Sequence, residues 1–353
     1  MGLFDDVLQS GESLIKNEDA LDYEFLPKIL PFREQEQRYL AECVKPLFNG
    51  RSGRNVLIHG VPGIGKTAAA RSVLRELEEK TDDIYVTYMN CWQHNTTFKV
   101  LMELCHQLGY KFTQNKATTE LVKVVASICN KKAVVFVFDE VDKLEDFDFL
   151  YTLLEEIFKK SVIMVTNYKS WLMELDERIK SRLMPELIEF EQYTSQQVVE
   201  ILKQRSHYAF VPGVWMPDAF TLITQKASDI RDVRAGLFLM KNAAIEAESK
   251  ASKKVLLMHA TTAITRLDDF FVKHTEELED DTKKILELVQ EHHGKKIGEL
   301  FHLYQKAGGT CSYKTFQRKL ARLDQNHFIT LERSLSGSGN TTIVKKISET
   351  KSA

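Results

Sequence analysis

The chain has 353 residues, 43% of them hydrophobic, and a net charge of −2, so it is long enough for two or three domains with packed cores. The absence of a long apolar run argues against an integral membrane protein, and we expect a soluble cytoplasmic protein. The net charge gives the chain as a whole no nucleic-acid-binding signature. Residues 281–353 nevertheless carry 13 Lys and Arg against 7 Asp and Glu, or +6, so the remainder carries −8, which indicates a basic module attached to an acidic one.

A glycine loop between a predicted strand and a predicted helix is the first motif along the chain. A helix is expected over Gln35–Leu47, followed by an apolar strand over Asn55–His59. Gly60–Thr67 then fits G-x-x-x-x-G-K-[ST], and a helix follows over Thr67–Glu79. In such a loop, backbone N–H groups and the positive end of the helix converge on phosphate oxygens. The predicted nucleotide contacts are Gly63, Ile64, Gly65, Lys66, Thr67 and Ala68.

The following segments predict a parallel sheet covered by helices on both faces. The expected elements are a strand over Ile84–Asn90, a helix ending near Leu108, a helix over Thr119–Asn130 and a strand over Ala133–Phe138. The inner face of the first of these helices is expected to carry Phe98, Leu101, Leu104 and Cys105. The last strand is apolar throughout, which is typical of a strand that is buried on both faces.

An acidic pair, Asp139-Glu140, stands where that apolar strand ends, and parallel sheets place active groups at this end. The Thr67 hydroxyl and Asp139 are predicted to hold Mg²⁺, while Lys66 reaches the β- and γ-phosphates. Glu140 is predicted to polarise the attacking water. Asn167 follows the next predicted strand, and its amide can orient that water.

A helix end over Asp176–Leu183 carries two arginines one turn apart, Arg178 and Arg182. It follows an expected helix over Phe149–Lys159 and a strand over Ser161–Val165, and a last strand over Leu187–Phe190 comes after it. Strands alternate with helices throughout residues 55–190, which predicts an α/β domain with a parallel sheet.

After Tyr193 the pattern becomes entirely helical. Thr194 and Gln197 form a capping-box pattern that opens a helix over Ser195–Tyr208. Three more helices are expected, over Asp218–Lys226, Ile230–Lys250 and Leu256–Lys273, before the acidic stretch 276–281. The predicted domains are a lead-in (1–21), a nucleotide-binding base (22–191), a helical lid (192–277) and a C-terminal domain (278–350).

The C-terminal domain reads as three helices and a hairpin, which is the pattern of a winged helix. The helices are expected over Thr282–Glu291, Ile297–Ala307 and Ser312–Asp324, and the strands over Phe328–Arg333 and Thr341–Lys346. On the third helix the apolar residues Phe316, Leu320 and Leu323 share one face, and the basic residues Lys314, Arg318 and Arg322 point the other way.

A basic face on this helix suits the major groove of DNA, and the tip of the hairpin, with Gly337 and Ser338, is expected to contact the DNA as the wing. The alternative is a winged helix used for protein contact, with basic residues that are merely solvated.

From about Asp22 to Ile347 the chain resembles the AAA+ ATPase superfamily, and within it the archaeal replication initiators of the origin-recognition-complex and cell-division-control type. Leu26–Glu34 looks like the segment beside the adenine, Asp139–Asp142 like the acidic motif, and Asn167 falls at the first sensor. The stretch 193–205 is similar to the initiators' lid, and 232–237 to their second sensor. The resemblance implies a P-loop AAA+ domain, a helical lid and a C-terminal winged helix.

The resemblance also assigns residues beyond the phosphate loop. Tyr193 and Arg205 are implied to contact ATP or ADP, and Arg234 to lie near the γ-phosphate, with Arg231 as the competing register. Residues 90–108 resemble an inserted helical element that initiators press against DNA. Arg182, after Ser181, matches an arginine that reaches the ATP of a neighbouring subunit, with Arg178 as the alternative. The other interpretation of both arginines is a local ion pair with Glu177 or Glu186.

The predicted function is therefore an ATP-dependent replication initiator, with slow ATP hydrolysis as a switch. It would bind origin duplex DNA in the nucleoid and, by resemblance, recruit the minichromosome maintenance helicase and further initiator copies. The alternatives are an AAA+ DNA-remodelling motor or clamp-loader-type ATPase, which predicts ring assembly and fast turnover, and an ATP-dependent transcription regulator.

Overall fold

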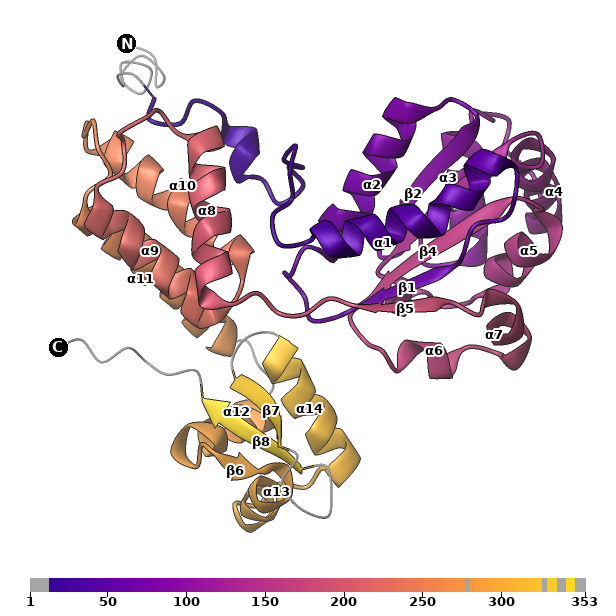
Figure 1. Ribbon diagram of the computed structural model, residues 1–353. Coiled ribbons are helices and arrows are strands. Elements are labelled where there is room, and N and C mark those ends of the chain that lie inside the picture. Colours follow the sequence, from indigo (N-terminus) through magenta and orange to yellow (C-terminus); the bar gives the residue numbers. More distant parts are fainter. Residues whose placement is uncertain (1–12, 277–279, 326–328, 335–340, 347–353) are drawn as a thin grey trace. The chain divides into compact units, whose positions relative to one another are not determined.

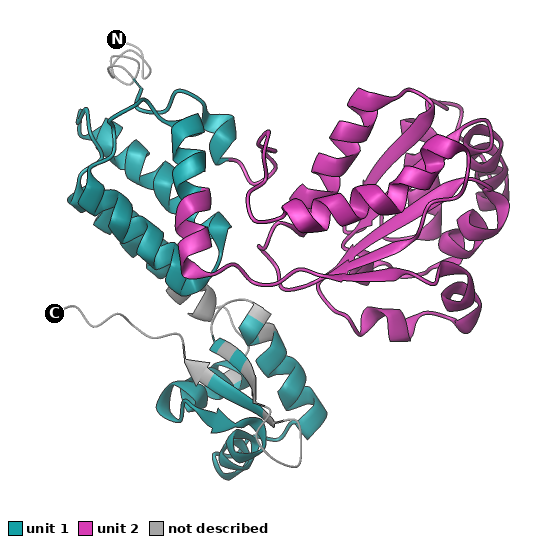
Figure 2. Ribbon diagram, in the orientation of Figure 1, with its two compact units in different colours: residues 1–21, 202–353 teal, residues 22–201 magenta. Residues whose placement is uncertain are grey.

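Figure 1 shows the computed structural model of the chain, which describes residues 13–276, 280–325, 329–334 and 341–346. The chain forms two compact units, an α/β unit of residues 22–201 and a helical unit of residues 1–21 and 202–353 (Figure 2). The helical unit is discontinuous in sequence, because its N-terminal segment precedes the whole α/β unit. The predicted domain boundaries after residues 21, 191 and 277 stay predictions.

A five-stranded parallel sheet forms the centre of the α/β unit, with the strand order β2-β3-β4-β1-β5. The strands are β1 (Val56–His59), β2 (Ile84–Asn90), β3 (Ala133–Asp139), β4 (Lys160–Thr166) and β5 (Glu186–Glu189). In register, His59 pairs with Thr166 and Asn90 with Asp139. The residues that follow β1, β3 and β4 therefore meet at one edge of the sheet, as the sequence predicts.

Helices cover both faces of this sheet, and every residue of β1 and β3 is therefore buried. The helices of the α/β unit are α1 (Glu34–Val44), α2 (Lys66–Lys80), α3 (Thr97–Gln107), α4 (Thr118–Cys129), α5 (Asp148–Glu156), α6 (Trp171–Glu174) and α7 (Glu177–Leu183). Helices α1 and α2 pack against each other, and α3, α4 and α5 form a second group (Figure 1).

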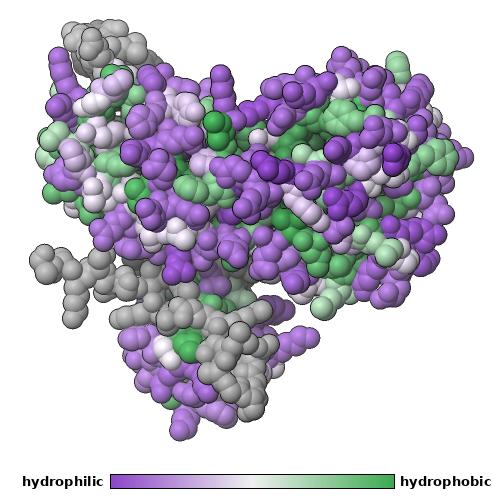
Figure 3. All heavy atoms as spheres, viewed as in Figure 1, coloured by the Kyte–Doolittle hydropathy of each residue, from purple (hydrophilic) through white to green (hydrophobic). Residues whose placement is uncertain are grey.

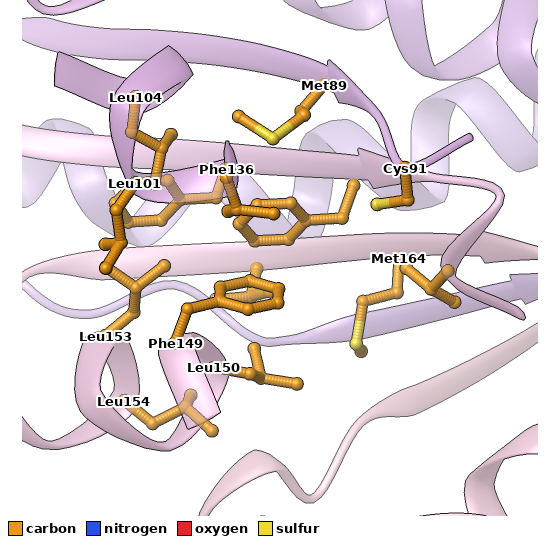
Figure 4. Packing of buried hydrophobic residues seen from close by; sticks show 14 of the residues in the cluster. Met89, Cys91, Leu101, Leu104, Phe136, Phe149, Leu150, Leu153, Leu154 and Met164 are labelled. Carbon is orange, nitrogen blue, oxygen red and sulfur yellow. The ribbon is translucent and has the colours of Figure 1, made fainter. Parts of the chain in front are cut away.

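A hydrophobic core of the α/β unit lies between the sheet and the second group of helices. Figure 4 shows Phe136 of β3 close to Phe149 of α5 and to Leu101 and Leu104 of α3. The prediction that Phe98 shares this inner face is wrong, since 44% of its surface is exposed. Phe98 lies in the first turn of α3, and helical side chains lean toward the N-terminus, so Phe98 projects past the packed part of the helix.

Four helices carry the chain beyond the sheet: α8 (Ser195–Ala209), α9 (Pro217–Ile230), α10 (Val233–Ser249) and α11 (Leu257–Glu276). The predicted capping box is confirmed, because Gln197 N–H donates to Thr194 Oγ1 (3.3 Å) and Thr194 N–H to Gln197 Oε1 (2.9 Å). The prediction that the next helix begins at Ile230 is wrong, because α10 begins at Val233. Arg231 ends α9 with a φ of 58°, and the Asp232 carboxylate caps α10 by accepting the Arg234 N–H at 2.8 Å.

The C-terminal segment has the expected winged-helix elements and one strand that was not predicted. It contains α12 (Asp280–Glu291), β6 (Lys295–Lys296), α13 (Ile297–Lys306), α14 (Tyr313–Gln325), β7 (Ile329–Ser334) and β8 (Thr341–Lys346). The sheet order is β6-β8-β7, with antiparallel pairing. Phe316, Leu320 and Leu323 of α14 are buried in the core of this segment, which confirms the apolar face.

The surface visible in Figure 3 is mostly hydrophilic, with small apolar areas on the α/β unit and on the lid helices. Within the described residues, no helix is both long enough and apolar enough to span a bilayer.

Candidate functional site

The predicted phosphate loop connects β1 to α2 at the edge of the sheet. Two of its glycines are required by close contacts as well as by positive φ values, which are 150° at Gly60 and 87° at Gly65. A Cβ atom at Gly60 would lie 2.5 Å from the carbonyl oxygen of Phe190, and one at Gly65 would lie 2.8 Å from the Tyr193 hydroxyl. Helix α2 begins at Lys66, so its first N–H groups face the loop.

Lys66 lies at the centre of the loop, and its side chain is largely buried. Its ammonium group donates to the carbonyls of Gly60 and Val61 and to Asn167 Oδ1, each at 2.8 Å. Asn167 directly follows the neighbouring strand β4, whose last residue, Thr166, pairs with His59. The structure therefore brings together the predicted phosphate-binding lysine and the predicted water-orienting amide.

Thr67 and Asp139 also meet as predicted. Thr67 Oγ1 donates to Asp139 Oδ2 at 2.6 Å, and the Glu140 N–H donates to Asp139 Oδ1 at 3.0 Å. A hydroxyl and a buried carboxylate form an all-oxygen donor set, which is the type that Mg²⁺ prefers. These two side chains fit a site for Mg²⁺ beside the phosphate loop.

Tyr88 is a third donor to Asp139, and the sequence alone did not reveal it. Its hydroxyl lies 2.8 Å from Asp139 Oδ2. The register of β2 and β3 places Tyr88 beside Val137, two residues before Asp139. Strand alternation could have pointed to this residue only after the pairing of the two strands was known.

Glu140 is half-buried and has a φ of 56°, a left-handed conformation that is rare for residues other than glycine. Burial raises the pKa of its carboxyl above the ordinary value, and the charges of Asp139 and Asp142 raise this pKa further. Asp142 holds the adjoining strand end, because its Oδ1 accepts from Thr166 Oγ1 at 3.0 Å. A half-buried carboxylate at the end of β3 is suited to accept a proton from water.

Tyr193 lies at the phosphate loop, beside a residue that was not singled out from the sequence. Arg33 is buried, and its Nε donates to the Ile64 carbonyl (3.0 Å) and to the Tyr193 hydroxyl (3.2 Å). Burial raises the pKa of the Tyr193 hydroxyl. One signal could have pointed to Arg33, because it is a charged residue directly after the Leu-Pro-Phe step of the segment predicted to lie beside adenine.

Arg205 and Arg234 belong to the helical unit, so their predicted contacts with ATP stay predictions. Arg205 is buried in α8. Arg234 lies in the first turn of α10, where its Nη2 is 2.9 Å from Asp232 Oδ2. Arg231, the competing register, is exposed between α9 and α10.

The arginines of α7 form local ion pairs, but not with the predicted partners. Arg178 Nε lies 3.1 Å from Asp176 Oδ1, and Arg182 pairs with Glu155 of α5. Both guanidinium groups also lie over the ring of Tyr151, at 6.0 Å and 4.8 Å. Glu177 pairs instead with Lys180, and Glu186 with Arg54. A role of Arg182 toward a neighbouring subunit stays a prediction.

The predicted nucleic-acid interface lies on α14. Lys314 and Arg318 are exposed there, while Lys319 turns inward and donates to Asp281 of α12 at 2.7 Å. The Arg322 side chain lies outside the described part of the structure, as do Gly337 and Ser338. In the α/β unit, the stretch 90–108 exposes Trp92 and Phe98, and Lys143 Nζ lies 5.2 Å from the centre of the Trp92 ring.

Comparisons with known proteins agree with this arrangement. Residues 29–165 match the AAA ATPase domain, and residues 199–265 match the Cdc6 AAA+ ATPase-type lid domain. The ORC1-type DNA replication protein 1 of Sulfurisphaera tokodaii is 32% identical over 284 residues, which are 75% of this chain and 71% of that protein. The protein of the same name from Archaeoglobus fulgidus is 30% identical over 344 residues, or 92% and 84% of the two chains.

A solved structure extends the similarity to nearly the whole chain. The Aeropyrum pernix ORC1 protein, determined in complex with DNA, is 26% identical and superposes with a TM-score of 0.67. The match covers 96% of this chain and 95% of that one. It includes the α/β unit, the lid helices and the winged-helix segment.

Proposed function

This chain belongs to the family of archaeal ORC1-type DNA replication proteins, and we propose that it initiates replication as an ATP-dependent, DNA-binding switch. The observation that carries the nucleotide half of this proposal is the convergence of Lys66 with Asn167 (2.8 Å) and of Thr67 with Asp139 (2.6 Å) at one edge of the sheet. Lys66 and Thr67 open α2 after the loop that follows β1, Asp139 ends β3, and Asn167 follows β4. Their functional groups are those that phosphoryl transfer requires.

On the nucleotide side, the N–H groups of residues 63–68 bind the phosphates, and the Lys66 ammonium moves onto the β- and γ-phosphates. Thr67 and Asp139 would hold Mg²⁺, which would supply positive charge to the phosphates. Tyr193 and Arg205 also contact the nucleotide.

Hydrolysis uses two groups at the same edge of the sheet and an arginine of the helical unit. Glu140 accepts a proton from the attacking water, and the Asn167 amide orients this water. Arg234, or Arg231 in its place, stabilises charge on the γ-phosphate. Turnover is slow, because the ATP and ADP states serve as the two positions of a switch.

On the DNA side, α14 enters the major groove of origin duplex with Lys314, Arg318 and Arg322, and the hairpin around Gly337 and Ser338 contacts the backbone. The exposed aromatic residues of the stretch 90–108 provide a second contact. The A. pernix relative, which was solved with DNA, supports this half of the proposal. On DNA the chain recruits the minichromosome maintenance helicase and further initiator copies, and it is associated with the nucleoid.

Genome-wide occupancy tests this function directly. Chromatin immunoprecipitation of the tagged full-length chain, with sequencing, should give its strongest peaks at the sites where nascent strands begin. Peaks confined to promoters would replace the initiator with a transcription regulator. Size exclusion with ATP and duplex DNA provides a second test, since a stable hexamer that hydrolyses ATP rapidly would identify a motor instead.

A further inference from the structure

Arg33 is a buried cation whose guanidinium contacts four residues of the α/β unit. Besides the Ile64 carbonyl and the Tyr193 hydroxyl, its Nη2 donates to the carbonyl of Glu191 at 2.6 Å, and its Nη1 lies 2.9 Å from Glu36 Oε1. The side chain keeps only 5% of its surface exposed. A buried guanidinium whose donors are left unpaired strongly destabilises a fold, and here every nitrogen has a partner.

Two aromatic rings hold the guanidinium in place. Its central carbon lies 4.2 Å from the centre of the Tyr193 ring and 5.0 Å from that of Phe190. Arginine at such a site is fixed both by its planar fork of donors and by the ring faces. The group therefore has little freedom to follow movements of the phosphate loop, and the loop must conform to it.

The contact with the loop is made at a peptide group that matters for phosphate binding. The carbonyl of Ile64 and the N–H of Gly65 belong to one peptide plane, and no cis peptide occurs among the described residues. In a trans peptide these two groups point in opposite directions. A guanidinium that holds the Ile64 oxygen therefore directs the Gly65 N–H to the opposite side of the peptide group, away from Arg33.

The same hydrogen bond also changes the strength of that N–H. A cation that donates to a carbonyl polarises the peptide group, and the attached N–H becomes a better donor. Gly65 directly precedes Lys66, where α2 begins, so its N–H is one of the unpaired donors at the helix N-terminus. These donors are the groups that bind phosphate in a glycine-rich loop.

We propose that Arg33 is a positioning residue for the phosphate loop. Through the Ile64 carbonyl it fixes and polarises the Gly65 N–H, which binds a nucleoside di- or triphosphate. Arg33 touches no phosphate itself. This inference rests on the proposed nucleotide site at residues 63–68.

The test measures ADP binding in EDTA, so that the result does not depend on Mg²⁺. Arg33→Lys keeps the charge but cannot hold both Ile64 and Glu191 with a planar fork. We expect its ADP dissociation constant to rise about tenfold, which corresponds to about 1.4 kcal/mol. Glu36→Gln is the matched control, because it removes the ion pair of the same guanidinium and leaves the Ile64 contact in place. Its ADP affinity should stay within about twofold of wild type.

A spectroscopic measurement separates positioning from a general loss of structure. The sequence contains two Ile-Gly steps, Ile64-Gly65 and Ile297-Gly298. Protein labelled with ¹³C-carbonyl isoleucine and ¹⁵N-glycine therefore gives two carbonyl–nitrogen correlations, of which the second is an internal reference. In wild type, ADP should shift the Gly65 amide proton downfield. In Arg33→Lys this shift should shrink, while it should persist in Glu36→Gln and the Gly298 signal should stay in place.

The possible outcomes are distinct. Equal ADP affinity and equal Gly65 shifts in Arg33→Lys and wild type would overturn the inference, as would equal losses in Arg33→Lys and Glu36→Gln. If wild type itself fails to bind ADP, the proposed function fails, and so does the inference that depends on it. Should Arg33→Lys not fold, the double variant Arg33→Gln, Glu36→Gln leaves no unpaired charge, and the same two measurements apply to it.

Discussion

The hydrogen bond from the Tyr88 hydroxyl to Asp139 should stabilise the carboxylate at the end of β3, and this can be tested. Asp139 is buried, and its carboxylate accepts from Thr67, from the Glu140 N–H and from Tyr88 at 2.8 Å. Tyr88→Phe removes one donor and keeps the ring, which also lies 5.3 Å from the Arg71 guanidinium carbon. A hydrogen bond to an ionised group contributes about 1.5–3 kcal/mol. We expect the free energy of unfolding of the α/β unit to fall by about 2 kcal/mol.

The assay needs a probe that reports this unit alone. The three tryptophans are Trp92, Trp171 and Trp215, and Trp171 is buried in the core of the α/β unit. Urea unfolding is therefore followed by Trp171 fluorescence in a background in which the other two are phenylalanine. In a thermal scan, the expected loss corresponds to a Tm lower by about 4–8 °C for a unit of this size.

Tyr85→Phe is the control on the same strand. The described part of the chain shows no hydrogen bond for the Tyr85 hydroxyl, and its ring contact with Lys132 Nζ, at 5.5 Å, is kept. This variant should differ from wild type by less than about 0.5 kcal/mol. If Tyr88→Phe is no less stable than Tyr85→Phe, the Tyr88 hydroxyl does not stabilise the Asp139 carboxylate.

Three further predictions concern the loop, its neighbouring histidine and the DNA-binding helix. Lys66→Ala should abolish tight ATP binding in isothermal titration while circular dichroism stays unchanged, and an affinity that remains micromolar would contradict the loop assignment. Burial lowers the pKa of His59, so the unfolded chain, whose histidine has an ordinary pKa near 6.5, binds more protons and the stability of the α/β unit should fall as pH drops from about 7.5 to 5.5. In His59→Gln the urea midpoint should depend less on pH over this range, and an unchanged slope would exclude His59 as the cause. Arg318→Ala should weaken binding to duplex DNA by about 1–3 kcal/mol in fluorescence anisotropy if it reads a base edge. Gln317→Ala serves as its control, and equal affinities would favour the protein-contact interpretation of α14.

Groups that lie close together in sequence, or that follow successive strands, could be predicted from the sequence. Lys66 and Thr67 belong to one motif, and Asp139 and Asn167 each follow an apolar strand. Parallel pairing brings strand ends together, so the meeting of these residues needed no knowledge of distant contacts. The capping box at Thr194 was predictable for the same reason, because its two partners are three residues apart.

Residues whose partners are distant in sequence were missed or misassigned. Arg33 contacts Ile64 and Tyr193, which are 31 and 160 residues away. Neither motif nor periodicity specifies such contacts, which depend on how the elements pack. The ion-pair partner of Arg182 was misassigned for the same reason, since it is Glu155 of α5 rather than a glutamate of its own segment. The two-residue strand β6 has too short a pattern to be recognised, and it forms only because β8 is there to pair with it.

The N-terminal segment has a consequence for the order in which the chain folds during synthesis. Ile15 pairs with Phe210, Leu14 N–H donates to Glu248 Oε1 at 2.7 Å, and Glu18 lies 2.6 Å from Lys241. The first described residues of the chain therefore have their partners about 200 positions later, after the whole α/β unit has left the ribosome. The α/β unit can close as soon as residue 201 emerges, because its contacts lie within one continuous stretch. The helical unit can form only later, because its N-terminal segment lacks its final contacts until α10 has been synthesised.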